Sequence, residues 1–359
     1  MTDTDADALP PALTARAITL AVATVGTALL VAAAGAMPVP YAISGPGPTR
    51  NTLGEQDGVP LIEISGAPVF PATGELLLTT VSVSGGPDYP VTIADVVRGW
   101  AEPGRTVSPV EEVFAPTDSR DEIDERNQAA MISSQENATV AALEELGYEV
   151  PTTLTIADAI EGSGAEGVVR ADDVIVAVDG APVVSFSELS AALDPVTPGD
   201  PIALGVLRGG ERHDLDITTT DDGAGRALIG VLVDPVFDFP VDVTIQIEDI
   251  GGPSAGTMFA LGIVDLLTEE DEADGEVIAG TGTMDLTGVV GPIGGIRQKL
   301  AGAVRDGATW FLAPADNCDE VVGHVPAGLR VARIATLAEA RTAVQAIGAG
   351  TADALPTCD

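Results

Sequence analysis

The sequence predicts an α/β fold, of the mixed α+β kind, together with a β-rich domain and one N-terminal transmembrane helix. Three observations lead to this prediction. Residues 17–37 form an uncharged apolar run, residues 151–220 read as short β runs separated by turns, and the chain from residue 241 onward alternates strand-like and helix-like patterns. A length of 359 residues with 45% apolar content allows two domains or more.

The composition excludes one class of partner. The formal net charge is −39, and the acidic residues are spread along the chain rather than gathered in a tail. Such a chain repels nucleic acid and anionic lipid surfaces, so we expect no nucleic-acid partner. The even spread indicates a solvated acidic surface.

The run from Ala17 to Met37 predicts a transmembrane anchor. Its 21 positions, at 1.5 Å per residue, span a bilayer core of about 30 Å. A cleaved signal peptide is the alternative, since Ala34-Gly35-Ala36 resembles a cleavage site, but its apolar region is usually only about 7–15 residues long. Arg16 is the one basic residue before the run, which favours a cytoplasmic tail at residues 1–16. We therefore expect a single-pass plasma-membrane protein whose body is extracytoplasmic.

Residues 38–149 read as a linker followed by the first part of an α/β domain. Gly45-Pro46-Gly47-Pro48 predicts a stiff, non-helical linker. Strand-like runs follow at residues 59–64 and 75–83, and residues 121–146 predict a helix that ends at Gly147.

Residues 150–235 have a β-rich texture. Strands are predicted at 174–178, 202–207 and 215–218, with a tight Asp179-Gly180 turn and a short amphipathic helix at 187–193. The run from Ala165 to Val183, in which a buried strand ends in an Asp-Gly turn, resembles a PDZ domain. The resemblance implies binding of extended peptides by strand addition at a sheet edge. An insert that packs structurally and binds nothing is the alternative.

Residues 236–349 predict an α/β domain, followed by a tail at residues 350–359. Residues 241–247 alternate apolar and polar side chains as a half-buried strand does, and a Gly-Gly-Pro-Ser turn follows. The elements predicted after that turn are a helix near 258–267, a strand at 276–283, a helix at 296–305 ended by Gly307, and a buried strand at 310–313.

The chain contains one lysine, Lys299, against 15 arginines. A desolvated lysine can lose its proton, whereas a guanidinium stays charged. A neutral amine next to a serine hydroxyl is a general base next to a nucleophile, and Ser254 lies 45 positions earlier. A leftover surface lysine is the alternative.

Ser254 lies where a strand turns sharply into a helix. Backbone N–H groups at a helix N-terminus lack intrahelical acceptors, and the helix dipole favours negative charge there. The turn therefore predicts an oxyanion site, and Gly251, Gly252 and Gly256 allow a substrate backbone to come close. A serine that merely starts a helix is the alternative.

Three motifs carry a second resemblance, to the proteolytic domain of Lon-family proteases. They are Gly251-Gly252-Pro253-Ser254-Ala255-Gly256, Gly280-Thr281-Gly282-Thr283, and the run from Gly288 to Lys299 that contains Pro-Ile-Gly-Gly. The resemblance covers residues 241–346. It implies a Ser–Lys dyad with Ser254 as nucleophile and Lys299 as base, supported by Thr281, Gly252 and Pro253.

The whole chain resembles the membrane-anchored, PDZ-containing Lon-like serine proteases of bacteria. This implies protein or peptide substrates, a homo-oligomer, commonly a hexamer, and a PDZ-like domain that is inserted into or precedes the proteolytic domain. The strand at 75–83 and the helix at 131–146 resemble the opening strand and first helix of that domain.

Two departures from the Lon pattern matter. Lon proteases commonly carry an acidic residue three positions before the serine, where this chain has Gly251. A P-loop needs a lysine followed by serine or threonine, and Lys299 is followed by Leu300, so we expect no ATPase. We also expect no cofactor and no metal, because the only histidines, His213 and His324, are far apart in the sequence.

Two other functions fit parts of the sequence. Gly252-Pro253-Ser254-Ala255-Gly256 also satisfies the nucleophile elbow of α/β-hydrolases, with Asp316 or Asp319 and then His324 in triad order. The PDZ-like region before the elbow does not read as repeated βαβ units, which counts against this. A non-catalytic, anchored PDZ scaffold is the other reading.

Cys318 and Cys358 are the only cysteines. An even pair in an extracytoplasmic chain predicts one disulfide. Two unrelated thiols are the alternative.

Overall fold

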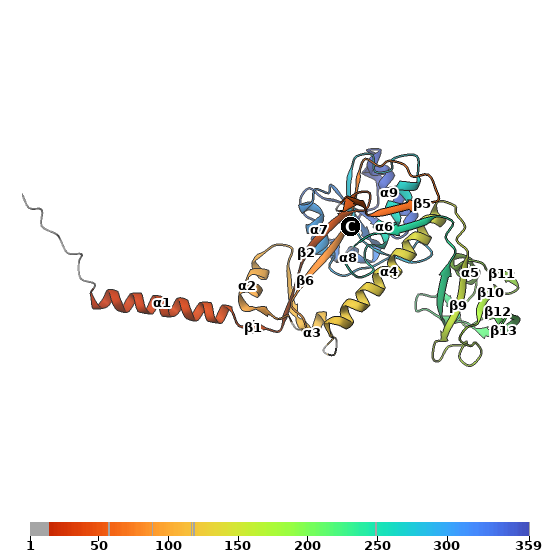
Figure 1. The fold of residues 1–359 in the computed structure, drawn as a ribbon, viewed down its shortest axis with the longest axis horizontal. Coiled ribbons are helices and arrows are strands. Elements are labelled where there is room, and N and C mark those ends of the chain that lie inside the picture. Colours follow the sequence, from red (N-terminus) through yellow and green to blue (C-terminus); the bar gives the residue numbers. More distant parts are fainter. Residues whose placement is uncertain are drawn as a thin grey trace, which may run out of the picture. The chain divides into compact units, whose positions relative to one another are not determined.

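The fold was analysed in a computed structural model (Figure 1), which describes residues 14–56, 58–87, 89–115, 117, 119–247 and 250–358. The chain divides into two compact units. The first contains the described residues up to Gly45 and Ser82–Arg120, and the second contains Pro46–Val81 and the chain from Asp121 onward.

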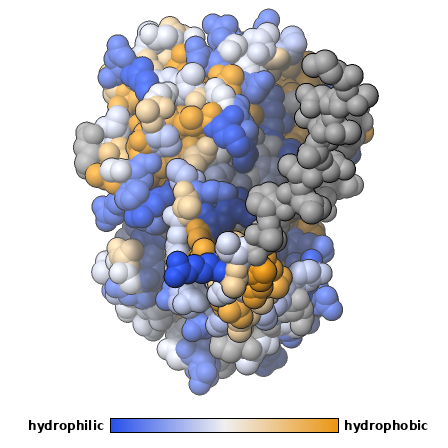
Figure 2. Space-filling model, turned by 90° about the vertical axis from the view of Figure 1, so that its left-hand side faces the viewer, coloured by the Kyte–Doolittle hydropathy of each residue, from blue (hydrophilic) through white to orange (hydrophobic). Residues whose placement is uncertain are grey.

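The first unit begins with helix α1 (Ala15–Gly35). The Thr14 side chain caps this helix by accepting a hydrogen bond from the Ala17 N–H, and none of its residues is buried. The helix is long and apolar enough to cross a membrane, although a signal sequence would share these properties. Figure 2 shows one face of the molecule, on which hydrophobic residues (orange) are exposed among hydrophilic ones (blue).

Short strands and one helix complete the first unit. Strand β1 (Pro38–Val39) pairs antiparallel with β7 (Val91–Thr92), and the start of β2 (Tyr41–Asn51) pairs antiparallel with β8 (Thr106–Pro109). Between β7 and β8 lies helix α2 (Ile93–Ala101), which begins in a capping box. The short helix α3 (Val110–Val113) follows β8.

The second unit contains a sheet whose order is β22-β21-β18-β6-β2. Its strands are β6 (Glu75–Ser84), β18 (Val277–Gly280), β21 (Trp310–Pro314), β22 (Arg330–Ile334) and the later part of β2. β18 pairs in parallel with both β6 and β21. A strand from before the PDZ-like region therefore pairs with a strand from after it.

The expected linker at Gly45–Pro48 is wrong, because these residues lie within β2. The strand lies against β6, and a Cβ at Gly47 would come within 2.9 Å of the Thr80 backbone carbon. The Pro48 carbonyl accepts a hydrogen bond of 2.7 Å from the Thr80 hydroxyl. Glycine is therefore needed for close strand packing, not for a linker.

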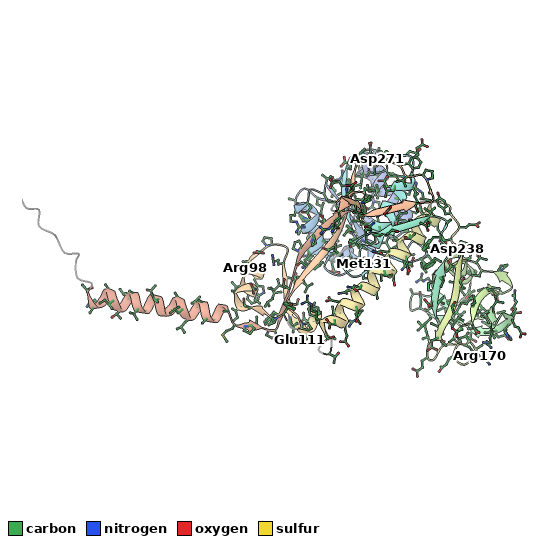
Figure 3. All side chains as sticks on the ribbon, viewed as in Figure 1. Arg98, Glu111, Met131, Arg170, Asp238 and Asp271 are labelled. Atoms are coloured by element: carbon green, nitrogen blue, oxygen red, sulfur yellow. A yellow bond between two sulfur atoms is a disulfide. The ribbon has the colours of Figure 1, made fainter. Side chains whose placement is uncertain are left out.

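Three helices pack with this sheet into the largest hydrophobic core. They are α4 (Arg120–Glu145), α6 (Gly256–Leu267) and α9 (Leu337–Gly348), whereas α7 (Ile296–Arg305) packs in a separate cluster with β21. Met131 of α4, labelled in Figure 3, is part of this core. α6 is buried from Gly256 to Asp265, so it is a core helix rather than an amphipathic surface helix.

The PDZ-like region has its own sheet, in the order β13-β12-β10-β9-β16, with β11 paired to β10. The bounds are β9 (Thr152–Ala159), β10 (Val174–Val178), β11 (Ala181–Pro182), α5 (Phe186–Leu193), β12 (Pro201–Arg208), β13 (Glu211–Thr218) and β16 (Val231–Phe237). The three predicted strands lie within β10, β12 and β13. Asp179 and Gly180 both have positive φ, +49° and +82°, as the predicted tight turn requires.

Other predicted elements differ in extent. α7 has the predicted bounds, whereas β17 (Asp242–Ile245) is shorter than the predicted strand. The strand predicted at 276–283 stops at Gly280 and resumes as β19 (Thr283–Met284), because Gly282 has a φ of +149°. The remaining short elements are β3 (Glu55–Gln56), β4 (Val59–Pro60), β5 (Ile62–Ser65), β14 (Thr220–Asp221), β15 (Ala227–Leu228), β20 (Val290–Gly291) and α8 (Cys318–Val321).

The structure joins Cys318, at the start of α8, to Cys358 in the C-terminal tail through a disulfide with a Cα–Cα distance of 5.0 Å. A backbone hydrogen bond of 2.8 Å from the Arg333 N–H to the Pro356 carbonyl also holds this tail.

Candidate active site

The turn that carries Ser254 precedes α6 directly. Gly252 has a φ of +87° and donates its N–H to the Asn127 carbonyl at 2.9 Å. At Gly251, a Cβ would lie 2.7 Å from Asn127 Cβ. The position where Lon proteases commonly carry an acid is therefore closed to a side chain here, and Asn127 of α4 occupies that space.

Lys299 of α7 is buried, with 2% of its surface exposed, and its amine is enclosed by three oxygens. Nζ lies 2.8 Å from Ser254 Oγ, 2.8 Å from Thr281 Oγ1 and 3.0 Å from the Thr79 carbonyl oxygen. Residues 45 positions apart in the sequence are thus in direct contact.

Burial lowers the pKa of the Lys299 amine from 10.5 to about 7. Apolar neighbours supply this environment: Ile296 and Leu300 are fully buried in one cluster, against which Ile293 packs. The three oxygens around Nζ are uncharged, so none of them offsets the desolvation as a carboxylate would. Arg297, on the same helix, is exposed.

Thr281 links the amine to the serine turn. Its hydroxyl donates a hydrogen bond of 2.9 Å to the Ser254 carbonyl, and the Gly282 N–H donates to the same carbonyl at 3.0 Å. A hydroxyl has one proton to donate, so the Thr281 oxygen must accept from Lys299.

The backbone at the start of α6 can bind an anion. Among the described residues, no acceptor is found for the Ser254 and Ala255 N–H groups. The Pro253 carbonyl accepts a hydrogen bond of 3.0 Å from the Ser134 hydroxyl, which holds the turn. Ser254 is half-buried, so its hydroxyl is enclosed but not sealed from substrate. These features suit an oxyanion site at a helix N-terminus.

Three contributors to the site were missed from the sequence: the Thr79 carbonyl, Asn127 and Ser134. Each acts through a backbone group or a contact with backbone, and each lies more than 100 positions before Ser254. The sequence gives only an indirect indication of these residues, because it predicts the strand and the helix that carry them but not their contacts.

The hydrolase alternative requires His324 as the base, but the hydrogen-bond contact of this residue is with the backbone of its own loop. It is exposed, and its Nδ1 lies 3.0 Å from the Val322 carbonyl oxygen. The hydrogen bond of Ser254 Oγ is made with Lys299. Within the described part of the chain, no group of three or more His, Cys, Asp or Glu residues is placed to hold a metal ion.

Comparisons with known proteins agree with this geometry. Residues 247–344 match the Lon protease (S16) C-terminal proteolytic domain, and residues 132–219 match the PDZ domain. Lon protease 1 of Bacillus subtilis is 34% identical over 102 residues, which are 27% of this chain and 13% of that protein. Lon protease 1 of Sorangium cellulosum is 40% identical over 92 residues, 25% of this chain and 11% of that protein. The chain thus spans only a small part of these relatives.

Among solved structures, the PDZ domain of an SdrC-like protein from Listeria monocytogenes is 23% identical, with a TM-score of 0.22; the match covers 23% of this chain and 86% of that domain. The Lon match includes the serine turn, and the PDZ match includes most of the β-rich region. The chain thus carries a Lon-type proteolytic domain and a PDZ domain.

Proposed function

We propose that this chain is an ATP-independent serine endopeptidase that uses a Ser–Lys dyad on extracytoplasmic or membrane-proximal proteins. The observation that carries the proposal is the 2.8 Å contact between Lys299 Nζ and Ser254 Oγ, made by an amine that is almost fully buried. Ser254 is the nucleophile and Lys299 is the general base.

The hydrogen-bond partners of Lys299 Nζ support transfer of the Ser254 hydroxyl proton to this amine. A neutral amine has two N–H donors and one lone pair. The Thr79 carbonyl can only accept, and the Thr281 oxygen must accept because its proton is used on the Ser254 carbonyl. Both N–H groups of a neutral Lys299 are thereby used, and its lone pair faces the Ser254 O–H.

This arrangement supports acyl transfer. As Ser254 Oγ forms a bond to the carbonyl carbon of a peptide, its proton passes to Lys299 Nζ, and the carbonyl oxygen becomes an oxyanion. The N–H groups of Ser254 and Ala255, with the dipole of α6, would stabilise that charge. Lys299 then returns the proton to the leaving amine as the C–N bond breaks. Water releases the acyl group by the same steps in reverse.

The residue that follows the one lysine supports the proposed ATP independence. Lys299 is engaged with Ser254 and is followed by Leu300, which leaves no lysine for a P-loop. The proposed extracytoplasmic location rests on α1 with Arg16 in its first turn, and on a disulfide between Cys318 and Cys358, a bond typical of oxidising compartments. Assembly as a homo-oligomer, a hexamer by family resemblance, is part of the same proposal.

The PDZ domain would bind an extended segment of the substrate. Its sheet has two edges, β13 and β16. β13 alternates charged side chains such as Arg212 and Asp214, which discourage strand addition. β16 exposes Leu232 and Val236, so a peptide with apolar side chains would add to this edge.

The test is hydrolysis of an unfolded protein and of a short fluorogenic peptide by the full chain in detergent micelles, with and without ATP. We expect Ser254→Ala to abolish both activities and His324→Ala to retain them, and ATP to change neither. Loss of activity in the His324 variant would favour the hydrolase alternative. An inactive wild-type chain that still binds peptide would favour the scaffold.

A further inference from the structure

Helix α2 exposes an apolar face in the same unit that contains α1. Ile93, Val97 and Trp100 are 36%, 55% and 69% exposed. Their spacing of four and three residues places them on one side of the helix. Apolar residues at helical spacing usually face a core, so an exposed row that ends in tryptophan marks an interaction surface.

The opposite side of α2 is fixed against the small core of this unit. Val96 is buried in a cluster with Ile43 and Val91. A Cβ at Gly99 would lie 2.9 Å from a Val107 methyl group, so the helix approaches β8 as closely as its backbone allows. The helix therefore cannot turn to bury Val97 without losing these contacts.

α2 begins where α1 ends. The Ile93 N–H donates to the Met37 carbonyl at 3.1 Å, and a Cβ at Gly35 would lie 3.7 Å from Ala94 Cβ. Strand β1 also pairs with β7, which leads directly into α2. In Figure 1, α2 lies beside the C-terminal end of α1. A bilayer that holds α1 would thus have its surface at the level of α2.

We infer that α2 lies in the interface of the bilayer that α1 spans, with Ile93, Val97 and Trp100 directed into the lipid. Tryptophan favours the level of the headgroups, where one end of its ring is apolar and the other is wet. Arg98, labelled in Figure 3, is exposed on the same helix, where its guanidinium lies 3.8 Å from Asp95 Oδ1, so the apolar side chains carry the inference. This inference rests on the proposed retention of α1 as an anchor, and it adds a second membrane contact.

A lipid surface is the favoured occupant because of continuity with α1. The strongly negative chain, with a net charge of −39, is repelled by anionic surfaces, so contact must come from an apolar face rather than a charged one. We therefore expect α2 to insert into zwitterionic lipid and to remain inserted at high salt.

The two tryptophans allow a direct test. Trp310 is only 6% exposed, within β21, whereas Trp100 is exposed. The full chain is reconstituted in phosphatidylcholine vesicles whose acyl chains carry bromine, a quencher of tryptophan fluorescence. In the Trp310→Phe variant we expect the remaining fluorescence to fall by about half or more, as for interfacial helices. In the Trp100→Phe variant we expect little quenching.

A second measurement guards against a folding defect in either variant. An environment-sensitive dye is attached to Val97→Cys and, as a matched control, to Val184→Cys in the PDZ domain, since the two valines are 55% and 57% exposed. We expect bromolipid to quench only the dye at position 97.

The outcomes separate the possibilities. A chain that does not float with the vesicles overturns the anchor, and this inference with it. A chain that floats while neither Trp100 nor the dye at position 97 is quenched overturns the inference alone. Quenching by aqueous iodide tests for a second copy of the chain. If Trp100 is protected from iodide only when a vesicle holds more than one chain, the apolar face contacts a second copy, and the inference is overturned.

Discussion

Asp173 of the PDZ region and Lys299 of the proteolytic region are both buried, and their surroundings are opposite in kind. In the PDZ domain, fully buried Asp173 accepts hydrogen bonds of 2.8 and 2.7 Å from Arg208, and this guanidinium lowers the pKa of the carboxyl. In the proteolytic domain, buried Lys299 is surrounded by neutral oxygens, and its pKa falls to about 7. A buried charge with an opposite partner holds structure, whereas one without a partner is ready to exchange a proton.

The substitution with the largest expected effect on this comparison is Lys299→Arg. A guanidinium cannot act as a base at neutral pH, so we expect peptide hydrolysis to fall by about 10³-fold or more. The matched control is Arg297→Lys, an exposed change on the same helix, which should retain normal activity. Circular dichroism of both variants checks that the fold is intact. Appreciable turnover by the arginine variant would rule out Lys299 as the base.

The pH dependence of the wild-type chain is the next test. Only the neutral amine can accept the serine proton, and its pKa is lowered to about 7, so activity should rise with pH through 7 and then level off. Well below the pKa the rate should fall about tenfold per pH unit, which gives about 100-fold between the high-pH plateau and pH 5. High salt should change the profile little, because the shift comes from burial. A rate that still climbs at pH 10 would indicate an unshifted lysine.

The sequence was sufficient to predict that Ser254 and Lys299 lie together, but not what surrounds them. One lysine and the Pro-Ser-Ala-Gly turn pointed to both proposed reacting groups, because short motifs report local chemistry. The Thr79 carbonyl and Asn127 could not be found this way, since β6 and α4 are brought to the site by tertiary packing across more than 100 residues. β9 and β16 were missed for a related reason: their pairing is set by the sheet, and Pro235 in β16 argues against a strand in isolation.

The proteolytic domain holds another buried charge without a partner, Asp265, near the C-terminal end of α6. One carboxylate oxygen accepts the Glu272 N–H at 3.0 Å, and the other is buried without a hydrogen-bond partner among the described residues. Burial raises the pKa of this carboxyl from 3.8 to about 6. Its protonated form is favoured on folding, so this group's contribution to stability is present below pH 3.8 and is lost as pH rises through 6.

We therefore expect Asp265→Asn to stabilise the protein by about 2 kcal/mol at pH 8, after allowance for partial solvation. The gain should vanish near pH 3, where the wild-type carboxyl is mostly protonated in both the folded and the unfolded state. Chemical denaturation of both proteins at the two pH values measures the difference. Equal stabilities at pH 8 would show that water or an ion satisfies the buried oxygen.

Thr281→Val sharpens the comparison at the dyad itself. Valine keeps the shape but removes the hydroxyl that accepts from Lys299 and donates to the Ser254 carbonyl. We expect about a tenfold loss of activity, the value of roughly one to two lost hydrogen bonds. Loss of an acceptor disfavours the charged amine, so the pH profile should also move to lower pH. Thr139→Val, whose hydroxyl bonds only within its own helix, is the control and should change neither property.

The smallest expected effect concerns Asp173 in the PDZ domain. Asp173→Asn keeps the size of the side chain but removes the charge that pairs with Arg208, while the Arg170 N–H also loses a carboxylate acceptor. We expect the unfolding midpoint of this domain to fall by about 5 °C, the change that about 1 kcal/mol produces in a domain of this size. The exposed pair Arg212–Asp214 in the same sheet has a similar contact, 3.2 Å, so Asp214→Asn is the matched control and should change the midpoint little.

Hydrolysis of a short peptide decides what the Asp173 charge does. If it only holds the PDZ fold, Asp173→Asn should leave the rate and its pH profile unchanged at temperatures where the domain remains folded. Cleavage of a long protein substrate would decline only as the PDZ domain unfolds. A change in the short-peptide pH profile would mean that the paired carboxylate influences the dyad, and the division between structural and reactive buried charges would then fail for this protein.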